Sequence, residues 1–221
     1  MPLWWRWRRR WTGYNPPCAC HVCPRRIANA HGNIGPEIDK SALVIVDMQN
    51  DFVHPDGGFA HLARERPDAK IDMPFLIGTI PCVKRLADAF RTAGGPVVYV
   101  AHVLKSDYSD AAFPYWRATK GSTSGNRTFI VEGSWGAQIV DELKPEGGDH
   151  LVIKKRFGGF SNTSLGYRMI IVRDAVAEVD RDTHEAELKT MARIFADVKS
   201  TDEVVDMLRR SAEPARGTGS R

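Results

Sequence analysis

The sequence has no run of about 18 apolar residues, so it predicts no membrane-spanning helix and no membrane partner. It also has no acidic residue among residues 1–36, where six of its 31 basic residues lie, all of them arginine. The other 25 basic residues are balanced by 27 acidic ones, so the rest of the chain is close to neutral. A nucleic-acid-binding body would show a basic face, so we expect no nucleic-acid partner.

Cysteine is scarce after residue 36, where Cys82 stands alone, and the other three cysteines lie in the stretch "CACHVC" at residues 18–23. A structural zinc site normally has two separated ligand pairs, and no second cluster follows this stretch. We therefore expect no metal and no other cofactor. With Cys82 alone in the body, disulfides are not expected to form the framework, and the reducing cytoplasm is the predicted location.

Composition divides the chain into three parts. Residues 1–36 are rich in arginine and tryptophan and are predicted to be a disordered extension. A mitochondrial address and a membrane-surface peptide are weaker alternatives for that extension. Residues 37–212 are predicted to form one α/β domain, and residues 213–221 a disordered tail.

Predicted strands and helices alternate along the domain, which is typical of a parallel sheet with helical crossovers. Short apolar runs rich in β-branched residues predict strands at residues 41–47, 96–101, 150–154, 168–174 and 196–199. Apolar residues at helical spacing predict helices at residues 79–94 and 135–144, and two more that begin near residues 182 and 200. The last two helices open with capping-box spacing, Asp182 with Glu185 and Ser200 with Glu203.

One connection breaks this alternation. Residues 156–167, "RFGGFSNTSLGY", join two predicted parallel strands but show three glycines and no apolar helical period. A parallel crossover needs about a dozen residues or more and usually contains a helix. The connection is therefore predicted to be truncated.

Three stretches, "ALVIVDMQNDF", "IKKRFGGFSNTSL" and "RDAVAEVDRDTHEAELKTMARIFADV", resemble the isochorismatase-like cysteine hydrolases. The resemblance is closest to the branch of ureidoacrylate amidohydrolases and biuret hydrolases, and it runs from Ser41 to about Leu208. It implies an α/β fold with a doubly wound, mostly parallel sheet of strand order 3-2-1-4-5-6. It also implies an Asp-Lys-Cys triad, of which Asp47 and Lys154 match the first two members. Lys155 is displaced by one residue, so strand alternation should point it to the other face.

The third member of the triad has no counterpart. In the family, the segment that matches "FSNTSL" leads into a helix, the fourth strand and the turn that carries the nucleophilic cysteine, whereas here Gly166 follows Leu165 directly. Roughly thirty residues are absent by this comparison. The chain is predicted to lack the fourth strand and its flanking helices.

The resemblance implies hydrolysis of C–N bonds in a small ureido or amide substrate, and homo-oligomers are common in the family. Because this chain lacks the cysteine, we predict that it is inactive or strongly impaired. The alternative is a non-catalytic binding or subunit protein that pairs with an intact homologue.

Aromatic residues near the matched motifs could line a flat ureido pocket, and the candidates are Phe52, Trp135 and Phe160, with core packing as the alternative for each. Nicotinamidases of the superfamily have an Asp-x-His pair after the second strand, and His102 lacks that spacing, so no catalytic metal is expected. His184 is interpreted as a residue that starts a helix near the surface.

If the fourth strand is missing, the remaining strands could be arranged in two ways. The strand at residues 168–174 could pair with the strand at residues 41–47 and close a five-stranded sheet, which is the arrangement we expect to see. Otherwise both strands would keep open edges, and the protein would aggregate or depend on a partner.

Overall fold

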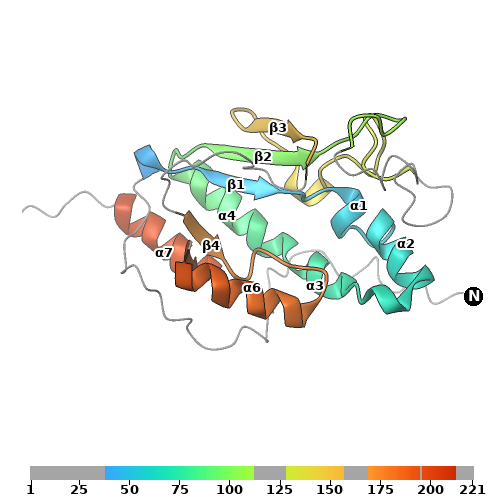
Figure 1. Ribbon diagram of the computed structural model, residues 1–221. Coiled ribbons are helices and arrows are strands. Elements are labelled where there is room, and N and C mark those ends of the chain that lie inside the picture. The colour runs from blue at the N-terminus through green and yellow to red at the C-terminus, as the bar shows by residue number, and fades with distance from the viewer. Residues whose placement is uncertain (1–37, 112–127, 157–168, 195, 213–221) are drawn as a thin grey trace, which may run out of the picture.

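The computed structural model describes residues 38–111, 128–156, 169–194 and 196–212. Its larger sheet has three parallel strands in the order β1-β2-β3: β1 (Leu43–Val46), β2 (Val97–His102) and β3 (His150–Lys154). This is the 3-2-1 half of the predicted order. All three strands end at the same side of the molecule, where β1 and β2 run beside each other (Figure 1).

The second sheet contains β4 (Met169–Val172) and β5 (Ala196–Lys199), which are also parallel. The prediction that the strand at residues 168–174 would join β1 in a five-stranded sheet is wrong, because β4 pairs with β5 and not with β1. β4 keeps this place because Ile170 and Val172 pack against the core that β1, β2 and the neighbouring helices share. Within the described residues, no strand lies between β1 and β4.

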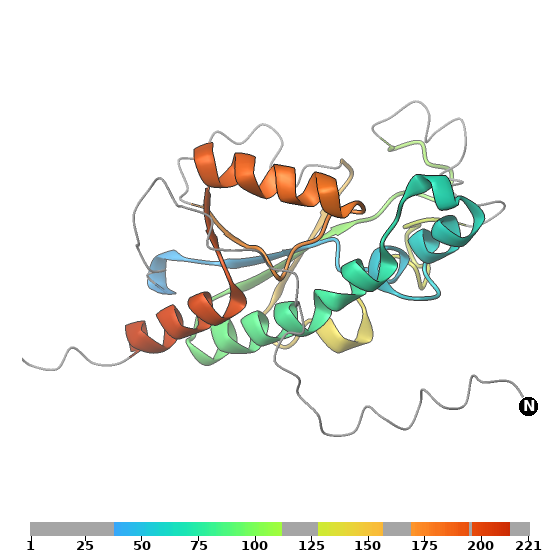
Figure 2. The ribbon, with the colours of Figure 1, turned by 90° about the horizontal axis from the view of Figure 1, so that it is seen from below.

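Helices cover both faces of the sheets. α4 (Ile80–Thr92) and α7 (Thr201–Ala212) pack on one side, and α6 (Arg181–Ile194) lies on the other (Figure 2). The main core lies between the first side and the strands; its members include Ile45, Val97, Tyr99, Val83, Leu86, Phe90, Val204 and Leu208. A smaller core joins α6 to the second sheet through Leu188, Ala192 and Val198. The result is a three-layer α/β fold, as predicted.

The remaining helical segments are short. They are α1 (Asn50–Val53), α2 (Gly58–Glu65) and α3 (Met73–Gly78), with 3-10 turns at η2 (Ile38–Lys40), η3 (Pro67–Ala69) and η4 (Asp141–Leu143). α1 and α2 lie beyond the carboxyl end of β1 (Figure 1). No helix in the described ranges is long and apolar enough to cross a membrane.

The helix ends follow the sequence in part. α7 has the predicted capping box, because Ser200 and Glu203 exchange hydrogen bonds between side chain and backbone N–H. α6 is instead capped by Asp180, the residue before its first turn, whose carboxylate accepts a hydrogen bond from the Thr183 backbone N–H at 3.1 Å. The predicted box of Asp182 and Glu185 therefore lies two residues too late.

The helix predicted at residues 135–144 is wrong. Only η4 is helical there, and the residues before it form an irregular loop. The carbonyls of Gly136 and Gln138 accept hydrogen bonds from the backbone N–H groups of Asp51 and Asn50, instead of from helical neighbours. Tertiary hydrogen bonds therefore replace the local helix.

The predicted extension at residues 1–36, the tail at residues 213–221, the connection at residues 156–167 and the truncation after Leu165 lie outside the described residues, apart from Arg156. The three-part domain division remains a prediction.

Candidate active site

Asp47 and Lys154 meet at the carboxyl ends of β1 and β3. The Lys154 Nζ atom donates a hydrogen bond to Asp47 Oδ2 at 2.6 Å. The Lys154 side chain is 7% exposed and that of Asp47 is 31% exposed, although the Asp47 Oδ1 atom itself is buried. Parallel strands bring these two residues together from 107 positions apart in the sequence.

The backbone of Asp47 is in the left-handed region, with φ of 58°. A side chain there costs on the order of 1–2 kcal/mol, and such strain is concentrated at functional sites. The Asp47 N–H donates to the Val100 carbonyl of β2 at 3.0 Å, which holds this conformation. β2 therefore fixes where the carboxylate points.

Burial raises the pKa of Asp47 above its ordinary value, while the Lys154 ammonium opposes the rise. A carboxylate that is more basic than usual, beside a buried cation, is suited to accept a proton. The ion pair thus has the properties of an acid–base site.

His102 ends β2, between the two strands that carry Asp47 and Lys154. Burial and the nearby positive charge of Lys154 lower the pKa of His102 to about 4, so its ring is neutral at neutral pH. The sequence suggests for His102 only a metal-binding role, which the missing Asp-x-His spacing excludes. The position of His102 at the end of the second predicted strand could have indicated that it is a site residue.

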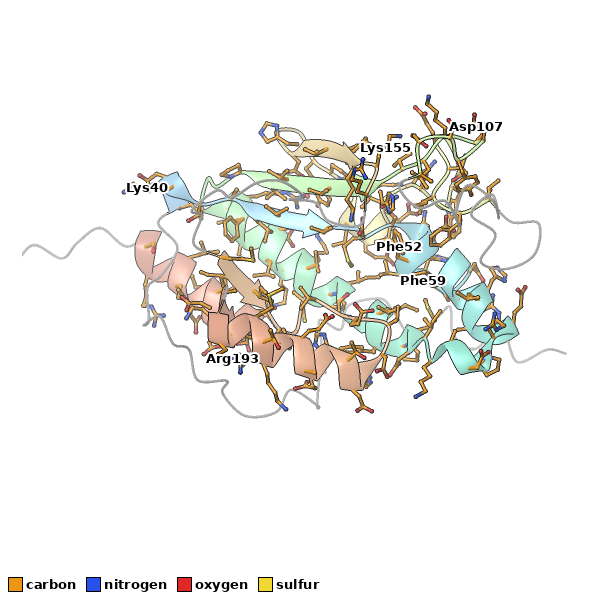
Figure 3. All side chains as sticks on the ribbon, in the orientation of Figure 1. Lys40, Phe52, Phe59, Asp107, Lys155 and Arg193 are labelled. Carbon is orange, nitrogen blue, oxygen red and sulfur yellow. The ribbon has the colours of Figure 1, made fainter. Side chains whose placement is uncertain are left out.

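Lys155 points away from the ion pair, as strand alternation predicted. Its Nζ atom lies 2.8 Å from the Asp110 carboxylate. Figure 3 shows Lys155 at the carboxyl end of β3, at the same end of the molecule as Phe52 and Phe59. Lys154, and not Lys155, is therefore the partner of Asp47.

The aromatic candidates lie in different settings. Phe52 on α1 packs edge-on against Phe59 of α2 and against Phe129, with ring centroids 5.1 and 5.3 Å apart (Figure 3). Trp135 is half-exposed and packs edge-on against His54. Phe160 lies outside the described residues. A substrate-binding role for these three residues stays a prediction.

Comparison with known proteins decides the family. The sequence model of the isochorismatase domain matches residues 41–166, which is more than half of the chain. The chain belongs to the isochorismatase family. Among curated proteins, this family member is 36% identical over 135 residues to the ureidoacrylate amidohydrolase RutB of Rhizobium rhizogenes, covering 57% of this chain and 52% of that one. It is 34% identical to RutB of Agrobacterium fabrum, covering 57% and 56%. The chain thus spans about half the length of the curated relatives it matches.

Solved structures of other proteins share the fold. A cysteine hydrolase from Pseudomonas syringae pv. phaseolicola superposes with a TM-score of 0.64 at 21% identity, covering 83% of this chain and 98% of that one. N-carbamoylsarcosine amidase from Thermoplasma acidophilum superposes with a TM-score of 0.51 at 25% identity, covering 73% and 96%. The α/β fold predicted from the sequence is thus confirmed.

Cysteine chemistry at this isochorismatase-family site would need a thiol near the ion pair. Cys82 is the only cysteine in the described ranges, and it lies in the core on α4, where it is 1% exposed and disulfide-bonded. The described residues also contain no group of three or more His, Cys, Asp or Glu residues that could hold a metal ion. Within them, the site therefore offers a base and a cation but no thiol nucleophile.

Proposed function

We propose that this chain descends from a hydrolase of C–N bonds in small ureido or amide compounds, and that it is inactive or strongly impaired. The observation that carries the proposal is the ion pair of Asp47 and Lys154 at the ends of two strands in one parallel sheet. The curated relatives are ureidoacrylate amidohydrolases, and one structural relative is an N-carbamoylsarcosine amidase. Both names point to a carbamoyl-type C–N bond.

The proposed chemistry assigns one role to each residue of a triad. A cysteine thiol has a pKa of about 8.5, so a neighbouring cation and base favour its thiolate at neutral pH. Lys154 would supply the cation and Asp47 the base. The thiolate would attack the carbonyl carbon, and the C–N bond would break as the amine leaves with the proton that Asp47 took from the thiol. Water would then hydrolyse the acyl-enzyme and free the thiol. Without the thiol, the base and the cation have no nucleophile to activate.

Two observations support loss of the nucleophile. The family match ends at residue 166, next to Leu165, after which the chain is predicted to be truncated. In addition, β4 pairs with β5, and among the described residues no strand takes the place beside β1 that a 3-2-1-4-5-6 sheet would fill. If the backbone donors of the oxyanion hole are absent too, each lost donor would cost about 10²–10³ in rate. Together these losses would abolish turnover by this route.

Turnover assays on the purified 221-residue chain test the proposal. With ureidoacrylate, biuret and N-carbamoylsarcosine as substrates, we expect no ammonia release above that of the Asp47→Asn variant. A matched control is Asp107→Asn, which changes an exposed carboxylate on the loop after β2 (Figure 3). Turnover that Asp47→Asn abolishes and Asp107→Asn preserves would overturn the proposal.

The gene offers an independent test of the truncation. We expect the nucleotide sequence between the Leu165 and Gly166 codons to contain a remnant that encodes the missing strand and cysteine turn. Uninterrupted coding sequence without such a remnant would exclude splicing and gene-model error as the origin, and would leave a true deletion.

The alternative function is a non-catalytic subunit that pairs with an intact homologue. This alternative is favoured by the outer edge of β1, with which no strand of the described ranges pairs and where Val44 and Val46 are exposed. Purification from the native source tests this alternative. Recovery of the chain alone, without a full-length homologue, would count against it.

A further inference from the structure

Three consecutive polar residues after the site aspartate are buried. Gln49, Asn50 and Asp51 are 0%, 4% and 5% exposed. Asp51 is the costliest of them to bury, because a carboxylate loses its hydration and no cationic side chain of the described ranges forms an ion pair with it. A buried carboxylate of this kind needs hydrogen bonds from the backbone to remain charged.

The Asp51 carboxylate receives those hydrogen bonds from two separate segments. Oδ1 accepts from the Gly58 N–H at the start of α2, at 3.1 Å, and Oδ2 accepts from the Ile130 N–H at 2.6 Å. The Asp51 backbone N–H also donates to the Gly136 carbonyl at 2.9 Å. One residue thus connects α1, α2 and the loop that precedes η4.

Besides forming these hydrogen bonds, the Asp51 carboxylate packs closely against Gly136 of the loop. A Cβ atom added to Gly136 would lie 2.1 Å from Asp51 Oδ2, which is well inside van der Waals contact. Glycine is therefore required at position 136 for the loop to approach the carboxylate. The position of the loop and the position of the carboxylate are set together.

Gln49 and Asn50 attach the same loop to the strand ends. Gln49 Nε2 donates to the carbonyls of His102 and Ala137, at 2.9 and 2.8 Å, and Gln49 Oε1 accepts from the His102 N–H at 2.7 Å. Asn50 Nδ2 donates to the Trp135 carbonyl at 2.8 Å. The loop that carries Trp135 is thereby held against the ends of β1 and β2, where Asp47 and His102 lie.

We propose that Asp51 is a positioning residue of the candidate site: its buried carboxylate fixes the loop at residues 130–138, and with it Trp135, relative to the ion pair of Asp47 and Lys154. In Asp51→Asn, the side-chain amide has one oxygen that can accept a hydrogen bond. Its NH2 group would face the second backbone N–H group, either that of Gly58 or that of Ile130. One of the two segments would then lose its hydrogen bond and shift. Burial raises the pKa of Asp51, and the N–H groups of Ile130 and Gly58 oppose that rise, as expected of a carboxylate in this setting.

The position of Trp135 can be measured without any ligand. We would label the full chain with 5-fluorotryptophan and assign the ¹⁹F resonance of Trp135 from its loss in the Trp135→Phe variant. In Asp51→Asn and in Gly136→Ala, we expect this resonance to shift by more than its line width while the thermal unfolding transition stays cooperative. Matched controls are Asp141→Asn, an exposed carboxylate in η4, and Gly147→Ala, where an added Cβ meets open space.

The outcomes separate positioning from a purely structural role. An unchanged Trp135 resonance in both variants overturns the proposal, and so does unfolding of both, because Asp51 would then be a core residue only. If Asp51→Asn alone unfolds, Gly136→Ala decides. The consequence for binding rests on the proposed function: Asp51→Asn should weaken binding of N-carbamoylsarcosine at least tenfold in calorimetry. Failure of the wild-type chain to bind that compound would remove the proposed ligand class and leave the resonance test unaffected.

Discussion

At the scale of single residues, the candidate site combines three groups that end neighbouring strands, Asp47, His102 and Lys154. Asp47 and Lys154 could be predicted because each directly follows or ends an apolar strand and matches a family motif. Their contact at 2.6 Å follows from parallel pairing, which aligns the strand ends. Because the His102 ring is neutral, it adds no second positive charge beside Lys154.

The depressed pKa of His102 makes the stability of the protein pH-dependent. The unfolded chain takes up a proton on this ring near pH 6.5, whereas the folded protein does so only near pH 4. The stability contributed by the neutral ring is therefore complete above pH 6.5 and is lost as the pH falls toward 4. Between pH 7 and pH 5 we expect the free energy of unfolding to fall by about 2 kcal/mol, measured by urea denaturation at pH 7, 6 and 5.

Variants isolate the contribution of His102 from that of other histidines. His102→Gln should flatten the pH dependence between pH 7 and 5. His150→Gln, which changes an exposed histidine at the start of β3, should leave it as in the wild type. Equal slopes for the wild type and His102→Gln would contradict the prediction.

At the scale of helices and strands, the sequence predicted those elements that a local pattern specifies. The five strands and α4 have apolar periods of their own, and Ser200 with Glu203 caps α7 as predicted. The helix predicted at residues 135–144 does not form, because the backbone N–H groups of Asn50 and Asp51 and the Asn50 side chain, about 85 positions away, donate hydrogen bonds to its carbonyls. Gln49 and Asp51 were likewise missed as site residues, because only the structure shows what they contact.

The N-terminus of α6 distinguishes the predicted cap from the observed one. Asp180 accepts hydrogen bonds from both the N–H and the hydroxyl of Thr183. We expect Asp180→Ala to lower the unfolding temperature by about 2–4 °C, because the first turn of α6 loses its cap. Asp182→Ala, which changes a residue two positions further along the chain, should lower the unfolding temperature less. Differential scanning calorimetry measures both, and a larger loss for Asp182→Ala would favour the cap inferred from the sequence.

At the scale of the whole molecule, one hydrophobic core holds two separate sheets. β4 contributes Ile170 and Val172 to the core that also contains Ile45 of β1, yet no backbone hydrogen bonds join the two strands. The sequence predicted the order of β1, β2 and β3, but it did not predict that β4 would pair with β5 and not with β1. That outcome depends on whether packing with β5 and α6 outweighs new pairing with β1, a balance that no local pattern encodes.

Among the described residues, β1 and β3 are the outer strands of the larger sheet, and natural proteins usually protect such edges. Leu43 and Asp47 direct their N–H groups to β2, so the intervening Val44 and Val46 direct theirs to the open side. β3 is an edge strand as well, and its Leu151, Val152 and Ile153 are about half-exposed. Neither β1 nor the middle of β3 carries a charge or a proline that would block pairing with another chain.

We therefore expect the chain to self-associate through these edges, and the associated fraction to rise with protein concentration. Light scattering at micromolar concentrations should give masses above the 24.7 kDa of a single chain, and these masses should rise with concentration. Lysine at either edge, in Val44→Lys or Val152→Lys, should lower them, because the charge would have to be desolvated when strands pair. Val176→Lys provides the matched control, since Val176 is 39% exposed, close to the 37% of Val44, but lies in the turn after β4. A constant mass for the wild type, with a sharp two-state thermal transition, would show that the edges of β1 and β3 are protected in solution.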